Sequence, residues 1–259
     1  MLIDTHAHLT MEQYTDLDEV IKRASENGVL KIINASFDIA SSEKGAELSG
    51  KYENLFFAAG IHPHHAETAD EEGMKKIRAL AACPKAVAIG ETGLDHYENP
   101  VPKEVQRRAF EAHLSLAAEL GLPVILHGRD AGEEMLDVIK ATGLRPETKG
   151  GLKGVFHCFS EDEDYARKVF DLGFLVSFTA IITFKNASKM REVVKYVPLD
   201  RMMLETDCPY LAPQIFRGSR NEPSYVRFVA EKLAEIKGIP VAEVEKATTA
   251  NAEGLFKLK

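Results

Sequence analysis

The 259-residue sequence lacks any run of about 18 apolar residues, so it predicts no helix that spans a membrane. No basic segment precedes the apolar start, and Asp4 and His6 interrupt it at once, so no secretory signal peptide is expected. The three cysteines are odd in number and widely spaced, which argues against a disulfide framework. These absences predict a cytoplasmic protein without a membrane partner.

An excess of positive charge is also lacking. Lysine and arginine number 32 and aspartate and glutamate 40, so the formal net charge is 32 − 40 = −8. Bulk charge gives no indication of a nucleic-acid partner, since an acidic surface repels phosphate unless a local group reverses the sign. No low-complexity segment or flexible linker divides the chain, and a single domain over 1–259 is expected.

The sequence does contain a regular alternation of short apolar runs and longer amphipathic stretches. Four stretches are predicted as helices, at 102–120, 161–172, 223–237 and 241–255. Pro102 fits the first turn of one of them, and Gly121 fits its end. The apolar runs predict eight strands: Leu2–His6, Leu30–Ala35, Leu55–Gly60, Ala86–Gly90, Pro123–Leu126, Gly154–His157, Phe174–Ser177 and Met202–Glu205.

Eight strand–helix units in about 250 residues are typical of a TIM (β/α)8 barrel. The rival α/β fold is a doubly wound open sheet, which usually carries a glycine fingerprint after its first strand. This chain has His-Ala-His at that place. The sequence therefore favours a TIM barrel.

Two histidines close the first predicted strand. His6 and His8 stand two residues apart, so their side chains point to the same face and suit one metal ion. Asp207 follows the eighth strand, which is the neighbour of the first in a barrel. Because the carboxyl ends of all barrel strands face the active site, we expect these three residues to share one ion.

A second set follows the middle strands. His127 and His157 end the fifth and sixth strands, which are neighbours in a barrel, and are expected to hold a second ion. Glu91 ends the fourth strand and is expected to bridge the two ions. The sequence thus predicts a binuclear metal centre of imidazoles and carboxylates.

Each ligand taken singly has an ordinary structural explanation. A lone histidine beside an apolar run is more often packed and hydrogen-bonded than a ligand, and an acid after a strand often caps a helix. All six residues fall at the ends of predicted strands, however, and packing or capping explains that poorly. His65, His96 and His113 keep the ordinary explanation, as residues of a solvated loop or a helix face.

Two divalent ions would supply two kinds of catalysis. They lower the pKa of a bound water from 15.7 to about 7, and roughly 3.5–4 Å apart they clamp the attacking and leaving oxygens of an in-line displacement. Asp207 is expected to orient the water and take its proton, and Asp207 and Glu91 are the predicted catalytic carboxylates. Imidazole ligands suit Zn, Mn, Co or Ni better than Mg, although nucleases are often assayed with Mg.

The ions would also reverse the local charge. The two ions would bring four positive charges, and Glu91 and Asp207 bring two negative ones. The resulting net positive site would attract an anionic substrate such as a phosphodiester. His62 and His64 follow the third strand and are expected to donate hydrogen bonds to a phosphate oxygen.

Basic residues after two strands are further candidates. Arg217, Arg220 and Asn221 follow the eighth strand, where barrels often bind phosphate. Arg129 stands two residues after the fifth-strand histidine and has the same potential role. A salt bridge to Glu205 or Glu222 is the ordinary alternative for these arginines.

Seven motifs, in order and spacing, resemble the TatD family of metal-dependent deoxyribonucleases, a branch of the amidohydrolase-type barrels. H-x-H alone would be weak, but the resemblance covers nearly the whole chain. The motifs are "DTHAHL" at 4–9, "GIHPH" at 60–64, "GETGLDHY" at 90–97, a Gln-to-Ala stretch with "LPVILHGRDA" at 106–131, "FHCFS" at 156–160, "ETDCPYLAP" at 205–213 and "RGSRNEP" at 217–223.

The resemblance implies hydrolysis of DNA phosphodiesters, commonly as a 3′-to-5′ exonuclease on single strands. It implies that four residues face the substrate: His62, His64, Arg217 and Asn221. It also implies two ligand sets that share one acid: His6, His8, Glu91 and Asp207 for one ion, and Glu91, His127 and His157 for the other. His113 departs from the pattern, since Gln is frequent at this position, and Glu161 stands where many relatives have Gly.

Other assignments stay open. A lactonase, phosphotriesterase or cyclic amidase is the nearest rival, although many such enzymes bridge their metals with a carboxylated lysine, and the fourth strand offers Glu91 instead. A non-catalytic metal-binding protein is less favoured, because mixed histidine and carboxylate ligation is typical of catalytic sites. DNA is the expected partner by resemblance, and a monomer is expected, with an oligomer left open.

Five aromatic residues near strand ends have two possible roles. No basic stripe accompanies them, so the sequence does not distinguish rings that stack on bases from rings that pack under loops. They are Tyr97, Phe159, Phe178, Tyr210 and Phe216.

Overall fold

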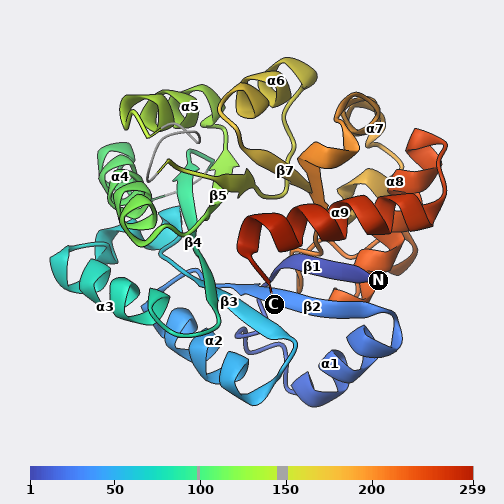
Figure 1. Cartoon of the computed structure of the whole chain (residues 1–259), viewed down its shortest axis with the longest axis horizontal. Helices are drawn as coiled ribbons and strands as arrows, with labels where there is room; N and C mark the ends of the chain where they lie inside the picture. The colour runs from blue at the N-terminus through green and yellow to red at the C-terminus, as the bar shows by residue number, and fades with distance from the viewer. Residues whose placement is uncertain (98–99, 145–150, 259) are drawn as a thin grey trace. The chain divides into compact units, whose positions relative to one another are not determined.

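The computed structural model describes residues 1–97, 100–144 and 151–258 (Figure 1). The chain divides into two compact units. The first unit comprises Met1–Asn34, Cys158–Arg167 and Leu175–Lys259, and the second comprises Ala35–His157 and Lys168–Phe174. Within the described residues, no helix has the length and apolar character needed to cross a bilayer.

All eight predicted strands are present, and helices alternate with them. The strands are β1 Leu2–Ala7, β2 Val29–Ala35, β3 Leu55–Ala59, β4 Ala86–Asp95, β5 Val124–Arg129, β6 Gly154–Phe156, β7 Leu175–Phe178 and β8 Met202–Leu204. The helices are α1 Leu17–Glu26, α2 Ile39–Lys51, α3 Glu71–Ala81, α4 Lys103–Leu120, α5 Gly132–Ala141, α6 Glu163–Asp171, α7 Ser188–Tyr196, α8 Val226–Lys237 and α9 Val241–Phe256. The four helices predicted from the sequence correspond to α4, α6, α8 and α9.

The first unit holds a parallel sheet with the order β7-β8-β1-β2. The first and last strands of the chain are neighbours, because Asp207 N donates to His6 O at 2.9 Å and His8 N to Cys208 O at 2.8 Å. This adjacency is what the barrel topology predicts. Helix α9 packs against β1, β8 and α8 (Figure 1).

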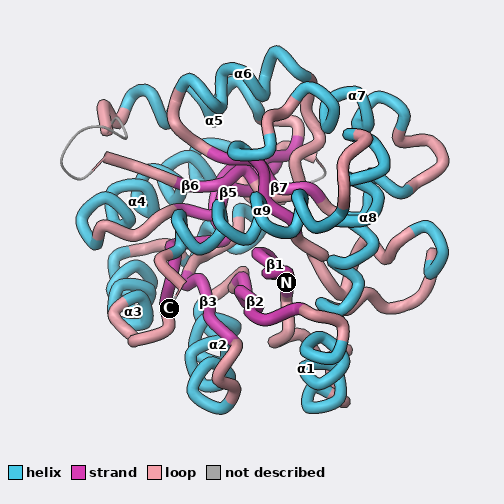
Figure 2. The backbone as a smooth tube through the Cα atoms, turned by 45° about the vertical axis from the view of Figure 1, so that its right-hand side comes forward, coloured by secondary structure: helices cyan, strands magenta, loops and turns pink. Residues whose placement is uncertain are grey.

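The second unit holds a parallel sheet with the order β3-β4-β5-β6. Helix α2 packs on β3 (Figure 2), and α4 packs on β4. Every residue of β3 is buried, which explains why this strand is a continuous apolar run in the sequence. Gly121, with φ of +65°, ends α4 as predicted, because a left-handed residue stops a helix at little cost only when it is glycine.

Strand β4 is longer than the sequence predicts. It continues past Gly90 to Asp95, so Glu91 lies inside the strand and not at its end. Gly90 and Gly93 have φ of +146° and +144°, and a Cβ at Gly93 would lie 2.0 Å from His127 O. The two glycines therefore permit a close approach of β4 to β5, although they look like a strand end in the sequence.

His113 lies in a helix, α4, as expected, and it is fully buried there. Its Nε2 accepts from Ile61 N at 3.1 Å, and its Nδ1 donates to Ala109 O at 2.7 Å. Burial lowers its pKa to about 4, which keeps the ring neutral. His113 thus ties α4 to the segment after β3.

Candidate metal centre

The first unit brings His6, His8 and Asp207 together. The two Nε2 atoms are 3.2 Å apart, and Asp207 Oδ1 lies 3.7 Å from His6 Nε2 and 3.3 Å from His8 Nε2. All three side chains are buried or nearly so. Two imidazole nitrogens and a carboxylate oxygen thus converge on one point, as the sequence predicts for the first ligand set.

A buried network fixes this group. Asp4 Oδ1 accepts from Thr206 N at 2.9 Å, and Asp4 Oδ2 accepts from Thr206 Oγ1 at 2.6 Å. Burial raises the pKa of Asp4 to about 8, although the hydrogen bonds from Thr206 oppose the shift. Asp4 therefore joins β1 to the residue that precedes Asp207, a role that the sequence did not reveal.

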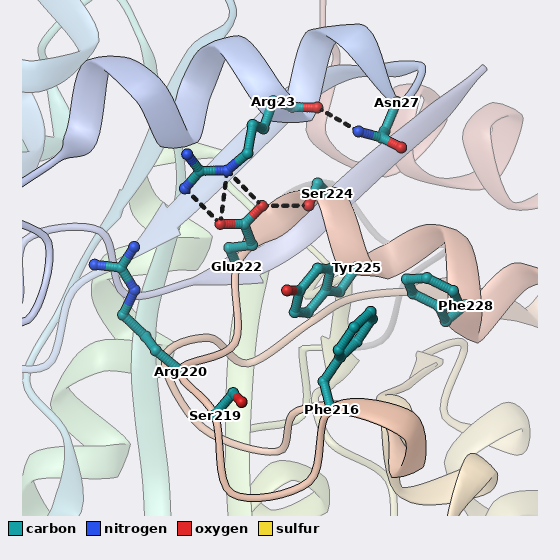
Figure 3. A pocket seen from close by; sticks show the side chains of 9 residues that line it. All are labelled: Arg23, Asn27, Phe216, Ser219, Arg220, Glu222, Ser224, Tyr225 and Phe228. Carbon is teal, nitrogen blue, oxygen red and sulfur yellow. Dashed lines mark hydrogen bonds and ion pairs between the residues drawn. The ribbon is translucent and has the colours of Figure 1, made fainter.

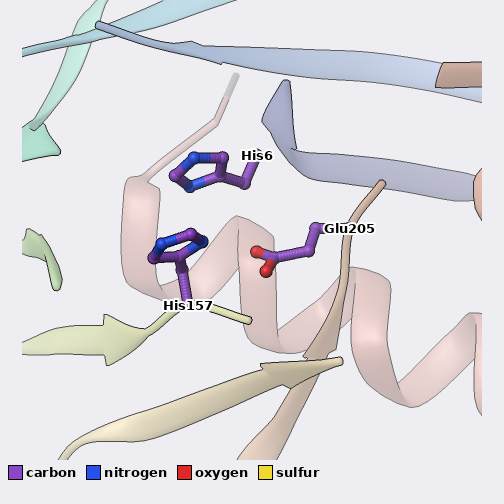
Figure 4. A group of neighbouring side chains, drawn as sticks. All are labelled: His6, His157 and Glu205. Carbon is purple, nitrogen blue, oxygen red and sulfur yellow. The ribbon is translucent and has the colours of Figure 1, made fainter. Parts of the chain in front are cut away.

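Glu205 is a second buried acid in the first unit. Its Oε2 accepts from Ser177 Oγ at 2.6 Å, and its Oε1 accepts from Cys158 N at 2.5 Å. A carboxylate oxygen of Glu205 lies within 4.8 Å of a ring nitrogen of His6 (Figure 4). The sequence offered Glu205 only as a salt-bridge partner for an arginine, whereas the structure places it beside a predicted ligand.

The second unit brings Glu91, His127 and His157 together. Glu91 Oε1 lies 2.9 Å from His127 Nδ1 and 2.8 Å from His157 Nε2, and the two ring nitrogens are 3.2 Å apart. Glu91 is almost fully buried. The three donors of the predicted second set therefore also converge on one point.

Asp95 is a site residue that the sequence analysis missed. Its Oδ2 lies 3.0 Å from His127 Nε2 and 3.1 Å from His64 Nε2, and its Oδ1 accepts from Tyr97 N at 2.9 Å. Burial alone would raise the pKa of Asp95, but the hydrogen bonds from His127 and Tyr97 outweigh it and hold the pKa at about 2. Gln106 fixes the backbone, because its Oε1 accepts from Asp95 N at 2.9 Å.

The same contacts determine the state of His127. Its Nε2 faces Asp95 and its Nδ1 faces Glu91. Burial would lower the pKa of His127, but hydrogen bonds with both carboxylates raise it. A histidine whose outer nitrogen donates to a carboxylate is the usual arrangement of a metal ligand, because the partner fixes the tautomer and the ring orientation.

His62 and His64 lie beside this group, as expected of substrate-side residues. His62 Nε2 lies 3.7 Å from Glu91 Oε1, while its Nδ1 accepts from His64 N at 3.1 Å. Burial lowers the pKa of His62 well below its usual value, so the ring is neutral and carries its proton on Nε2. His62, Asp95 and His127 also offer three ligand atoms within 4.8 Å of one another.

The donor geometry of both groups fits a divalent cation. Two imidazole nitrogens that bind one tetrahedral zinc at about 2.0–2.1 Å lie roughly 3.3 Å apart. The nitrogen–nitrogen distance is 3.2 Å in each group. The chemistry of the donors agrees, since imidazole with one carboxylate suits Zn, Mn, Co or Ni.

Asn221 does not have the surroundings of a substrate-binding residue. It is fully buried, and its Nδ2 donates to Thr206 O at 2.9 Å and to Tyr210 O at 2.6 Å. Its Oδ1 accepts from Glu222 N at 2.9 Å. These contacts hold the loop after β8, and they commit the donors that a phosphate would need.

The arginines after β8 differ from one another. Arg220 pairs with Asp16, and Arg23 rather than Arg220 pairs with Glu222 at 2.7 Å. Both arginines line a cavity of about 610 Å³ beside a cluster of aromatic rings (Figure 3). The guanidinium of Arg217 is exposed and lies 3.8 Å from the centroid of the Phe184 ring, so it keeps the proposed role of a phosphate contact.

Comparison with known proteins places these groups in a family. The family model described as TatD related DNase matches residues 3–257. YabD of Bacillus subtilis strain 168, an uncharacterized metal-dependent hydrolase, is 44% identical over 259 residues that cover 100% of both chains. TatD of Erwinia tasmaniensis, described as a 3′-5′ ssDNA/RNA exonuclease, is 35% identical over 99% of this chain and 100% of its own.

A solved structure agrees with this result. The crystal structure of YjjV, a TatD homologue from Escherichia coli K12, superposes with a TM-score of 0.92 at 31% identity and covers 100% of this chain and 98% of the other. The parallel pairing and the adjacency of β1 and β8 accord with that likeness. The predicted TIM-barrel class is confirmed.

Proposed function

Because the chain belongs to the TatD-related DNase family of metal-dependent hydrolases, we propose that it hydrolyses DNA phosphodiester bonds as a 3′-to-5′ exonuclease on single strands. One observation carries the proposal. Each unit gathers two imidazole nitrogens and one carboxylate oxygen within 4.8 Å, from residues far apart in the sequence. The exonuclease described for the 35% identical relative supports DNA as the substrate class.

We assign one divalent ion to His6, His8 and Asp207, and a second to Glu91, His127 and His157. When bound, such ions lower the pKa of water and offset the charge that develops on a phosphoryl group. Each assignment depends on the donor atoms of one unit alone.

The protein's own groups then have distinct tasks. Asp207 Oδ1 faces both imidazoles of its group, so this carboxylate is the one we assign to orient the attacking water and accept its proton. His62 carries its proton on Nε2 and remains neutral, so it donates a hydrogen bond to a phosphate oxygen without adding charge. Arg217 supplies a cation that forms no ion pair within the described part of the chain.

A product analysis tests this function. The protein is stripped with a chelator, reloaded separately with Mn²⁺, Zn²⁺, Co²⁺, Ni²⁺ or Mg²⁺, and incubated with single-stranded oligonucleotides labelled at the 3′ or the 5′ end. We expect metal-dependent release of mononucleotides from the 3′ end. His127→Ala and Asp207→Asn should each reduce the rate by at least about 100-fold with an unchanged circular dichroism spectrum.

Two results would contradict the proposal. Hydrolysis of lactone or phosphotriester substrates without cleavage of DNA would show that the protein has another amidohydrolase activity and is not a nuclease. Full activity of His127→Ala would remove this residue from the metal centre. A Tyr196→Phe variant is the matched control, since Tyr196 lies at the end of α7 and outside both groups.

A further inference from the structure

The aromatic residues near the strand ends have different surroundings in the structure. Phe159 is 5% exposed and Phe178 is fully buried, so both belong to the core. Phe216 stacks on Tyr225 with a centroid distance of 4.6 Å and an interplanar angle of 13°. These three rings pack under loops and between helices, which leaves two of the five candidates.

The two remaining rings are both tyrosines. Tyr97 is 43% exposed, but the guanidinium of Arg129 lies over its ring, 3.7 Å from the centroid. Tyr210 is 49% exposed and lies three residues after Asp207. Its ring is 6.3 Å from the ring of His8, centroid to centroid, with an interplanar angle of 69°. Tyr210 is therefore an exposed aromatic ring beside the ligand group of the first unit.

The backbone holds Tyr210 firmly. Tyr210 N donates to Asp207 O at 3.0 Å, and Tyr210 O accepts from Asn221 Nδ2 at 2.6 Å. Asp207 and Leu211, on either side, have left-handed φ values of +54° and +55°. Residues other than glycine occupy this region only when their surroundings fix them, so the backbone on which Tyr210 stands is held in place.

An exposed aromatic ring on a well-held backbone is a usual stacking partner for an unpaired nucleobase. Resting on the proposed nuclease function, we infer that Tyr210 forms a stacking subsite for the base next to the scissile phosphate. The ring lies beside His8, so a base on it stays close to the ion that acts on its own phosphate. The subsite favours single strands, because a base in a duplex is already stacked and paired. It also tolerates any sequence, since every base has a π face.

The absence of tryptophan from the chain allows a direct binding assay. Tyr210→Trp, in the metal-loaded protein, introduces a single tryptophan whose fluorescence is quenched when a base stacks on it. We expect quenching by deoxyadenosine monophosphate and none by deoxyribose 5-phosphate, which lacks the base. Tyr196→Trp is the matched control, because Tyr196 is also exposed, at 38%. Tyr196 stands six residues before β8, whereas Tyr210 stands six residues after it.

Steady-state kinetics give a second measurement. Tyr210→Leu should raise KM for a single-stranded oligonucleotide about tenfold, as expected for one lost base–aromatic stack, while Tyr210→Phe stays near wild type. With an oligonucleotide whose 3′-terminal residues lack their bases, wild type and Tyr210→Leu should have the same KM.

The outcomes separate the two proposals. If the wild type cleaves DNA but Tyr210→Trp gives no base-dependent quenching, or Tyr210→Leu leaves KM unchanged, the subsite is refuted and the nuclease function stands. Equal quenching of Tyr210→Trp and Tyr196→Trp would also refute the subsite. If the wild type does not cleave DNA, the function itself is refuted.

Discussion

Asp95 gives the sharpest test of how the second ligand group is built. Its Oδ2 accepts from His127 Nε2 at 3.0 Å, which leaves the Nδ1 lone pair of His127 directed at the point shared with Glu91 and His157. We expect Asp95→Asn to disturb this arrangement while the size of the side chain stays the same.

The introduced amide cannot accept from both His127 Nε2 and Tyr97 N, as the carboxylate does. Asp95 Oδ1 already accepts from Tyr97 N at 2.9 Å. If the amide oxygen keeps that contact, the NH2 group faces His127 Nε2, and the proton of His127 moves to Nδ1, where it blocks a metal ion. If the amide turns over, its NH2 group faces Tyr97 N, and two donors oppose each other.

Loss of a carboxylate behind a metal-binding histidine typically costs about 10–100-fold in metal affinity. One tenfold step corresponds to about 1.4 kcal/mol, so we expect the free energy of binding to weaken by roughly 1.4–2.8 kcal/mol. The assay is competition between a chelator and the metal-free protein for Zn²⁺ or Mn²⁺, followed by calorimetry. Of the two binding events, only one should weaken. Combination with Asp207→Asn identifies it, because that change removes the carboxylate of the other group.

Asp130→Asn is the matched control. Asp130 follows β5 directly, is exposed, and has a φ of +52°, a conformation that asparagine adopts readily. It loses the same charge and should bind metal like the wild type. An affinity of Asp95→Asn within twofold of wild type, or an equal loss in Asp130→Asn, would refute the positioning role of Asp95.

Two further predictions concern stability. The pKa of His113 is about 4 in the folded protein and 6.5 without burial, so as the pH falls the unfolded chain binds a proton first. The contribution of neutral His113 to the free energy of unfolding is therefore fully present above about pH 6.5 and is lost as the pH falls from 6.5 to 4. The difference of 6.5 − 4 = 2.5 pKa units corresponds to about 3 kcal/mol. We expect His113→Gln to remove this pH dependence when urea unfolding is measured at pH 4.5 and 7.5. If the free energy of unfolding changes equally with pH in the variant and the wild type, the prediction is wrong. Gly93→Ala should destabilise by more than about 2 kcal/mol, because its Cβ meets His127 O at 2.0 Å at a φ of +144°. Its control, Gly254→Ala in α9, meets nothing within 4 Å and should stabilise by a few tenths of a kcal/mol to about 1 kcal/mol; a Gly93→Ala variant as stable as this control would be incompatible with the packing of β4 on β5.

The strands and the predicted metal ligands were accessible from the sequence because both depend on local order. Parallel strands buried on both faces leave continuous apolar runs, and a ligand at a strand end has a fixed distance from its run. His6 and His8 illustrate this: His6 lies in β1 and His8 follows its last residue, and alternation along an extended chain puts both side chains on one face. The strand order then brings Asp207 beside them, as Asp207 N donating to His6 O demonstrates.

Long-range partners were not accessible in the same way. Arg220 binds Asp16, which is 204 residues away, and no local pattern identifies that pair among forty acids. The side-chain amide of Asn221 is of a kind that often binds substrate, but both of its N–H donors are used by backbone carbonyls after β8. Burial and hydrogen-bond saturation decide such roles, and both are properties of the folded chain.

Asp95 was missed for a more specific reason. The strand expected from the sequence ends at Gly90, within "GETG", so Asp95 lies five residues beyond it, whereas β4 extends to Asp95. In the structure Glu91 and Asp95 are on the same strand, and Gly93 between them faces the backbone of His127. A conformationally special glycine inside a strand often marks a close backbone approach.

The ligand groups have a consequence for folding. His6 and Asp207 are 207 − 6 = 201 residues apart, and Asp4 with Thr206 provides the buried link between their segments. In the unfolded chain these donors are far apart, so the ion binds the folded protein much more tightly than the unfolded chain. Metal binding therefore adds to the free energy of unfolding by about RT ln(1 + [M]/Kd), where [M] is the free metal concentration. The buried carboxylates that orient the ligands act in the same direction, since each joins two segments that metal binding also requires to be together.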